Sequence, residues 1–291
     1  MRHVPRAVWL ALVVSLAFLP AVAQAQPPGP AAWARFLDLR CYQIPNQPQL
    51  LVPLTLSHLN PVLAEKFGLP DEDVVLGQPN QLCLPVRKNN QNIPFQVLNY
   101  LRWLDLKCYK IAGPSVDVPL HLDHLNAVIA GLLGPGLDVK VREPEQLCVP
   151  ITKNNAAIPA DVSELIRWID LKCYRVETET INPNVPITLR HLNPLFAALP
   201  QENTTIFGPA PVQLCVPVAK NGQKPPDTVL KQVSYSDVLC YRLGGLPLNQ
   251  QLTLHHLNPV LREMGLAPEQ VFVTNTEELC VPVAKNGDFP P

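Results

Sequence analysis

Short runs in which apolar and polar residues alternate recur along the chain and predict β-strands. Between residues 104 and 108, the apolar residues Leu104, Leu106 and Cys108 are separated by polar ones, so their side chains face one side of a strand. Other short runs rich in branched apolar residues occupy residues 52–56, 74–76, 137–141 and 185–189. A mainly β fold is therefore expected.

The clearest helix signal begins at Asn60. Asn60 can cap a helix, the following proline fits a first helical turn, and Gly68 suits the left-handed residue after a helix end. The same order of residue types recurs at residues 258–265, and each helix is only about two turns long. Residues 93–102 and 158–167 fit a helix or a strand, and we favour a short helical turn that leads into the next strand.

One arrangement of these elements occurs four times. Each copy has an Asp three residues before a Cys-Tyr pair, then His-Leu-Asn, and then Leu-Cys-x-Pro followed by Lys-Asn. The copies divide most of the chain into residues 26–92, 93–157, 158–224 and 225–291. Such repetition predicts four small, disulfide-stapled, β-rich units, each with one short helix, that stack as a rod-like array in which each unit contacts mainly its neighbours.

The units resemble a class of secreted bacterial tandem-repeat modules of unknown function. Those modules read Cys-Tyr-Lys early, as at residues 108–110, and Leu-Cys-x-Pro-Val-x-Lys-Asn-Gly late, as at residues 214–222. The chain departs from the pattern at Asn90 and Asn155, where Gly is expected, and in its added His-Leu-Asn-Pro segment. The resemblance covers all four units and implies secretion, disulfides and repetition, but nothing catalytic.

Residues 1–25 are predicted to be a signal peptide. Arg2 and Arg6 give a positively charged start, an apolar run covers residues 7–19, and residues 23–25 read Ala-Gln-Ala, so cleavage is expected before Gln26. The apolar run is shorter than the roughly 20 residues that span a bilayer, and we expect no membrane anchor. The product is expected to be secreted, at the cell surface or outside the cell, with the periplasm as the alternative.

Eight cysteines occur as two per unit, 40 or 42 residues apart. Export places them in an oxidising compartment, and no C-x-x-C cluster indicates a metal site. We predict the bridges Cys41–Cys83, Cys108–Cys148, Cys173–Cys215 and Cys240–Cys280. Each would stabilise its unit by about 4 kcal/mol in the loop-entropy model. A unit of about 66 residues needs such a bridge because its hydrophobic core is small.

Composition excludes several function classes. The chain has 23 Lys and Arg against 24 Asp and Glu, so it lacks the positive charge that binds nucleic acid. Its 34 prolines argue against long helices. The pattern contains no Gly-rich phosphate loop and no recurring carboxylate pair of the kind that hydrolyses glycosides. No cofactor is expected.

One histidine recurs in each unit, before the Leu-Asn pair. These residues are His58, His124, His191 and His256. A catalytic base needs a nucleophile or an orienting acid, and no serine recurs at equivalent positions. We therefore predict structural histidines that hydrogen-bond to neighbouring backbone carbonyls, with no catalytic or metal-binding residues in the chain.

An aspartate and a lysine also recur in each unit. The aspartates are Asp38, Asp105, Asp170 and Asp237, and the lysines are Lys88, Lys153, Lys220 and Lys285. If the bridges hold the two ends of a unit together, each Asp can pair with the Lys of its own unit. The alternatives are that both are solvated, or that the Lys-Asn pair forms a turn, which is favoured where Gly follows.

Aromatic residues recur five residues before and one residue after the first Cys of each unit. They are Phe36, Trp103, Trp168 and Tyr235, and Tyr42, Tyr109, Tyr174 and Tyr241. An exposed row of these side chains could stack on sugar rings or on a partner chain. Packing in the core or between units is the interpretation that we favour.

These patterns favour a non-enzymatic structural or adhesive protein of the cell surface or extracellular matrix. The alternative is a protein that binds extracellular polysaccharide through the aromatic residues, whereas a hydrolase is not indicated. Pro291, counted from Lys285, and Pro27, counted from Cys41, both match Pro94 of the first linker. The tail of one molecule and the head of the next would therefore complete a linker, which raises the hypothesis of a head-to-tail fibre.

Overall fold

The computed structural model describes residues 26–180 and 183–291, so the predicted signal peptide lies outside the described residues. Each unit contains a helix, a strand, a second strand, a short helix and a long strand. The first unit has α1 (Pro30–Arg35), β1 (Leu39–Gln43), β2 (Val52–His58), η1 (Val62–Lys66) and β3 (Glu72–Lys88). The second has α2 (Phe95–Leu101), β4 (Asp105–Ala112), β5 (Val118–His124), α3 (Ala127–Leu133) and β6 (Gly136–Lys153).

The third unit has α4 (Ala160–Ile166), β7 (Leu171–Glu177), β8 (Val185–His191), η2 (Pro194–Phe196) and β9 (Glu202–Lys220). The fourth has α5 (Asp227–Ser234), β10 (Val238–Leu243), β11 (Gln250–His256) and α6 (Pro259–Glu263), and its long strand is divided into β12 (Glu269–Val273) and β13 (Thr276–Lys285). The predicted mainly β fold with short helices is confirmed. Each unit has two such helices rather than one, because the favoured helical turn between units is present as well.

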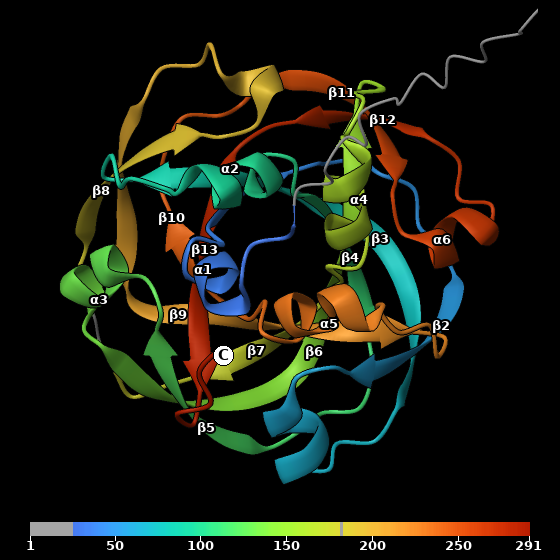
Figure 1. Cartoon of the computed structure of the whole chain (residues 1–291), viewed down its shortest axis with the longest axis horizontal. Helices are drawn as coiled ribbons and strands as arrows, with labels where there is room; N and C mark the ends of the chain where they lie inside the picture. The colour runs from blue at the N-terminus through green and yellow to red at the C-terminus, as the bar shows by residue number, and fades with distance from the viewer. Residues whose placement is uncertain (1–25, 181–182) are drawn as a thin grey trace, which may run out of the picture.

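The first strand and the long strand of each unit form a closed antiparallel ring. β1 pairs with β3, β4 with β3 and β6, β7 with β6 and β9, and β10 with β9 and β13. β13 pairs in turn with β1, with Cys280 opposite Leu39. Figure 1 shows the strands around a central axis. The predicted rod is therefore wrong: eight strands close into a barrel, which leaves none of these strands with an open edge.

The second strand of each unit links opposite units. β2 pairs with β3 of its own unit and with the end of β9, and β8 pairs with β9 and with the end of β3. β5 and β11 join the second and fourth units in the same way. Each unit thus pairs with all three others, and the prediction that units contact mainly their neighbours is wrong. A long strand has this reach because of its length: β3 contains 17 residues, of which residues 72–76 pair with β2 and residues 86–88 pair with β8.

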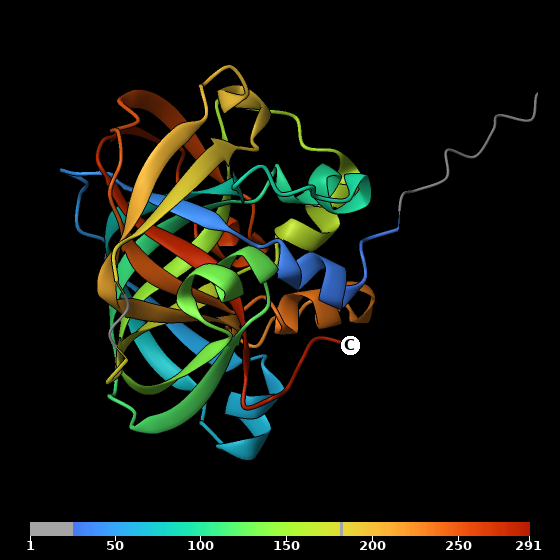
Figure 2. The same ribbon diagram turned by 90° about the vertical axis from the view of Figure 1, so that its left-hand side faces the viewer.

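Both faces of the ring strands are buried. In β1, Leu39 and Cys41 belong to the core cluster around the axis, whereas Tyr42 packs in a separate cluster with Leu252 and Leu254 of β11. The axial cluster is completed by apolar residues of α1, α2, α4 and α5. These four helices lie together at one end of the barrel (Figures 1 and 2). The barrel interior is therefore a packed core, closed at the helical end.

The two ends of the described chain meet at the helical end of the barrel. The Ala31 amide donates a hydrogen bond to the Pro291 carbonyl at 3.3 Å, and the chain end marked C lies beside α1 (Figure 1). The indole nitrogen of Trp33 donates to Ser236 at 2.9 Å. The tail and head do complete a linker, but within one molecule. The strand edges that the fibre hypothesis required are already paired with each other.

Candidate functional site

The eight cysteines line the barrel axis in one layer. Bonded partners lie directly opposite each other in the strand register, and the four predicted bridges within units are confirmed. Sulfur atoms of adjacent bridges are also in contact: the Sγ–Sγ distances are 3.8 Å for Cys41–Cys280 and Cys83–Cys108, and 3.9 Å for Cys148–Cys173 and Cys215–Cys240. The eight sulfur atoms thus form one closed, buried ring, which we call the sulfur ring.

A polar layer lies next to the sulfur ring, on the side away from the helices. It contains the residue two positions before the second Cys of each unit: Gln81, Gln146, Gln213 and Glu278. Gln81 is opposite Gln43 at the end of β1, whereas Leu39 at the start of β1 follows α1, so the glutamines face the other end of the barrel. Three amides and one carboxyl group break the fourfold repetition of this layer.

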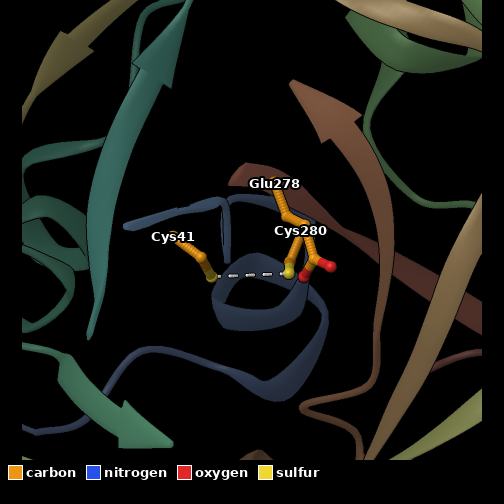
Figure 3. A group of neighbouring side chains, drawn as sticks. All are labelled: Cys41, Glu278 and Cys280. Atoms are coloured by element: carbon orange, nitrogen blue, oxygen red, sulfur yellow. Dashed lines mark hydrogen bonds between the residues drawn. The ribbon is translucent and has the colours of Figure 1, made fainter. Parts of the chain in front are cut away.

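Glu278 is the single carboxyl group in that layer. A carboxylate oxygen of Glu278 and the sulfur atoms of Cys41 and Cys280 lie within 4.8 Å of one another (Figure 3). Burial raises the pKa of Glu278 to about 8, and the nearby carboxylates of Glu277 and Glu145 act in the same direction. The two sulfur atoms belong to disulfides and lack the thiolate that binds metal ions. The site is therefore a carboxyl group placed against two disulfides.

The recurring histidines bond to the recurring tyrosines of the opposite unit. Tyr OH and His Nε2 are 2.8 to 2.9 Å apart in all four pairs: Tyr42–His191, Tyr109–His256, Tyr174–His58 and Tyr241–His124. The predicted backbone carbonyl partner is found only for His124, which contacts the Gly134 oxygen at 2.8 Å, among the described residues. Burial lowers the pKa of all four histidines, to about 3 for His191 and His256. Their imidazoles are therefore uncharged at neutral pH.

The recurring aspartates and lysines pair within each unit. The buried ion pairs are Asp38–Lys88, Asp105–Lys153, Asp170–Lys220 and Asp237–Lys285. Burial raises the pKa of Asp105 and Asp237 to about 6 although the lysines oppose it. The cap residue Asn60 also donates to Asp237 at 2.8 Å, and its Oδ1 accepts from the Val62 amide at 3.0 Å, as expected of a helix cap. Pairing across the bridged strands is therefore confirmed.

The Lys-Asn pairs also form turns. Asn89 and Asn154 adopt left-handed backbone angles, and Asn90 and Asn155, which stand where the module pattern has Gly, do so as well. Asn tolerates this conformation better than most residues, which explains the departure. The side chain of Asn89 accepts a hydrogen bond from the Thr188 amide of the opposite unit at 2.8 Å.

A second set of ion pairs, which the sequence analysis missed, joins opposite units. Arg40 pairs with Glu202 at 2.6 Å, Lys107 with Glu269 at 2.5 Å, and Lys172 with Glu72. At the fourth equivalent position, both members are apolar, Leu239 and Leu137, in one core cluster. The sequence does hold a sign of this pairing, because the unit that lacks the basic residue has an opposite unit that lacks the acidic one. It can be recognised only once the opposite units are known to be in contact.

The aromatic residues do not form an exposed row. Tyr42, Tyr109, Tyr174, Tyr241 and Phe36 are buried. Trp103, Trp168 and Tyr235 are partly exposed. Trp103 lines a cavity of about 310 Å³ together with residues that include Asn154 and Asn193. Packing in the core is therefore the correct interpretation for the tyrosines and Phe36. The tyrosines are covered by the second strands of the units, such as β5 and β11, whereas Phe36 packs among the helices at the barrel end.

Comparison of the chain with protein-family models, curated proteins and solved structures gives no match. Four disulfides are typical of an oxidising, extracellular-type compartment. All helices within residues 26–180 and 183–291 fall short of the length and apolar character that crossing a bilayer requires.

Proposed function

We propose that this chain is an exported, non-enzymatic structural or adhesive protein, a disulfide-braced barrel that acts at the cell surface or in the extracellular matrix. The proposal agrees with the resemblance to secreted bacterial repeat modules. It differs from the fibre hypothesis, because the chain ends complete one barrel rather than a contact between molecules.

One observation carries the proposal: the side chains able to do chemistry that recur fourfold are used inside the molecule. Each of the four recurring tyrosines is hydrogen-bonded to a recurring histidine, each recurring aspartate is paired with a recurring lysine, and each cysteine is in a disulfide. The His residues are buried and have a lowered pKa, so they do not serve as bases near neutral pH. The repeated polar residues therefore support the barrel and leave its outer surface for contacts.

The test is deletion of the gene in the producing organism, followed by measurement of cell retention on a surface and of extracellular matrix mass. We expect both to fall and to be restored by the purified, folded protein added from outside. Protein with its disulfides reduced and alkylated is the matched control and should not restore them. Unchanged retention and matrix in the deletion strain, or turnover of an extracellular polymer by the pure protein, would contradict the proposal.

A second candidate is binding of extracellular polysaccharide at the cavity lined by Trp103. Trp103 and the exposed residue Asn154 both line this cavity, and an aromatic ring beside a side-chain amide is a suitable combination for a sugar ring and its hydroxyl groups. A glycan array with the wild-type protein and Trp103→Ala tests it, with Phe95→Ala, an exposed aromatic residue outside that cavity, as the control. Signals that Trp103→Ala abolishes and Phe95→Ala keeps would favour this candidate.

A further inference from the structure

The sulfur ring offers a second complete way of pairing the same eight cysteines. In the observed pairing, each bridge lies within a unit. In the shifted pairing, every bridge joins two units: Cys83–Cys108, Cys148–Cys173, Cys215–Cys240 and Cys41–Cys280. These are the four contacts at 3.8 to 3.9 Å, so each sulfur atom has one bonded and one contacting neighbour.

We propose that the sulfur ring is a site of thiol–disulfide exchange, in which a thiol introduced at one cysteine moves from unit to unit around the barrel. The inference goes beyond the proposed structural role and does not depend on it. Exchange requires a thiolate next to a disulfide sulfur atom. At all four junctions between units, the sulfur atom of one bridge lies in contact with a sulfur atom of the next bridge.

One exchange step leaves the number of disulfides unchanged. The Cys108 thiol first loses its proton, and the resulting thiolate attacks Cys83. The Cys83–Cys108 bond forms as the Cys41–Cys83 bond breaks. Cys41 leaves as a thiolate and takes up the proton that Cys108 lost. Cys41 is then next to Cys280, and the same step there releases Cys240. No oxidant or reductant is consumed, because each step exchanges one disulfide for another.

Glu278 is placed to carry the proton at one junction. Its carboxyl group is near both Cys41 and Cys280, which meet between the fourth and first units. The other three junctions have Gln81, Gln146 and Gln213 in the equivalent layer, and an amide cannot accept a proton from a thiol. Glu278 therefore makes the junction between Cys41 and Cys280 the fastest of the four.

The decisive variant removes one cysteine from each of two adjacent bridges, Cys148→Ser with Cys173→Ser. Observed pairing of its six cysteines leaves Cys108 and Cys215 as free thiols, whereas shifted pairing bonds all six. During refolding with oxidised and reduced glutathione, Cys108 displaces Cys41, Cys41 displaces Cys240, and Cys240 with Cys215 gives two electrons and two protons to oxidised glutathione. We expect no free thiol in denaturant and the peptide linkages Cys83–Cys108, Cys41–Cys280 and Cys215–Cys240.

The matched control is Cys108→Ser with Cys148→Ser, which also has six cysteines but keeps three bridges in the observed pairing. Two free thiols per chain in the first variant, with Cys41–Cys83 and Cys240–Cys280 retained, would overturn the proposal. If circular dichroism shows that only the control folds, the single variant Cys148→Ser decides. Its thiol, trapped with N-ethylmaleimide, should be found at Cys41, Cys240 and Cys173 as well as Cys108, and a thiol confined to Cys108 overturns the proposal.

Glu278 is tested with two single variants that each free one thiol. Cys83→Ser frees Cys41, next to Glu278, and Cys215→Ser frees Cys173, whose junction with Cys148 has Gln146 in the position of Glu278. Adding Glu278→Gln should slow release of Cys240 in the first variant by at least about tenfold and leave release of Cys108 in the second unchanged. Equal rates with and without Glu278→Gln would overturn the role of Glu278.

Discussion

Each repeated tyrosine shares its hydrogen bond with a histidine that is 116 to 149 residues away in the sequence. The ion pair between Lys172 and Glu72 spans 100 residues in the same way. These side chains recur because each one needs a partner in the opposite unit. A substitution in one unit should therefore remove a contact with the opposite unit. The fourth position, where Leu239 and Leu137 replace the charged pair, shows what an apolar contact at this place looks like.

The first prediction concerns Lys172 and Glu72, both almost fully buried. Lys172→Leu alone leaves the Glu72 carboxylate without its cation and should lower the free energy of unfolding by about 3–5 kcal/mol. The double variant Lys172→Leu with Glu72→Leu reproduces the Leu239 and Leu137 arrangement and should be within about 1 kcal/mol of wild type. Urea unfolding with the disulfides intact measures both.

The control for this prediction is Lys110→Leu, which changes an exposed lysine in β4, a strand that pairs with β3, and should alter stability by no more than about 0.5 kcal/mol. A double variant as unstable as the single one would show that the charged pair contributes more than its apolar replacement. The interpretation of the fourth position as an equivalent contact would then be wrong.

The second prediction is a pH dependence that comes from Glu278. Its pKa is raised to about 8 in the folded state, where it faces Gln81, Arg242, Glu277 and Glu145. The folded state then holds this proton at pH values where the unfolded state has lost it, so its contribution to stability is present below about pH 4.5 and is lost as the pH rises to about 8. The slope is at most about 1.4 kcal/mol per pH unit.

Glu278→Gln removes this titration and restores the residue found in the other three units. The free energy of unfolding of the variant minus that of wild type should therefore increase from pH 5 to pH 8. Taking this difference cancels the contributions of the histidines and of Asp105 and Asp237, which the two proteins share. A difference that stays constant over this range would exclude Glu278 as the titrating group.

At the scale of elements, the helix that precedes each first strand packs at one end of the barrel. Three of these helices follow a linker from the preceding unit, whereas α1 is reached only from the N-terminal side. The tail near Pro291 completes this fourth corner, as the hydrogen bond from Ala31 shows. The packing at this corner is therefore the same as at the other three, and it does not depend on the chain beginning and ending there.

The third prediction follows from that corner. A circular permutant in which a short Gly-Ser linker joins Pro291 to Gly29, and in which the chain is opened between Asn155 and Ala156, should fold with the same four disulfides. Both opening residues are exposed in the turn between the second and third units. Circular dichroism and peptide mapping check the fold, and the melting temperature should change by no more than a few degrees because no packed element is cut.

A permutant opened within β9 instead, after Val216, is the control. Val216 is buried, and β9 pairs there with β7, so this protein should not fold. Failure of both permutants would mean that the covalent order at the helical end is itself required.

At the scale of the whole molecule, strand pairing runs around the ring and also across it. Because β13 pairs with β1 and opposite units exchange their second strands, no unit retains its hydrogen bonds if another is removed. A linear repeat array unfolds by units, with coupling between neighbours only. The barrel should instead behave as one cooperative structure, and replacement of Cys148 should weaken all units rather than the second alone.

The fourth prediction is that the protein in residues 26–291 is a monomer in sedimentation velocity at high concentration, because its two terminal strands pair with each other. Deletion of residues 26–35 should lower the melting temperature, since it removes Trp33, which is fully buried and bonded to Ser236. The deletion should not change the oligomeric state of the folded fraction. Filaments of full-length protein that the deletion dissolves would instead support the head-to-tail fibre.

The sequence by itself determined the content of each unit. The four copies, the disulfide partners, the Asn caps before the short helices and the turns at Lys-Asn all follow from residue types at fixed local spacing or from counting. Such features depend on neighbours along the chain, so one unit is enough to recognise them. The pairing of Asp105 with Lys153 also belongs here, because the bridge between Cys108 and Cys148 brings their strands together.

Only the tertiary structure decided how the units are arranged. A rod and a closed ring have the same pattern within every unit, so the repeat cannot distinguish them. Alternation in strands such as Leu104–Cys108 indicated one buried face, yet Lys107 is buried as well, because Glu269 of the opposite unit compensates its charge. The sulfur ring and the Tyr–His pairs likewise exist only because β1 meets β13 and opposite units exchange strands, which are contacts between residues remote in sequence.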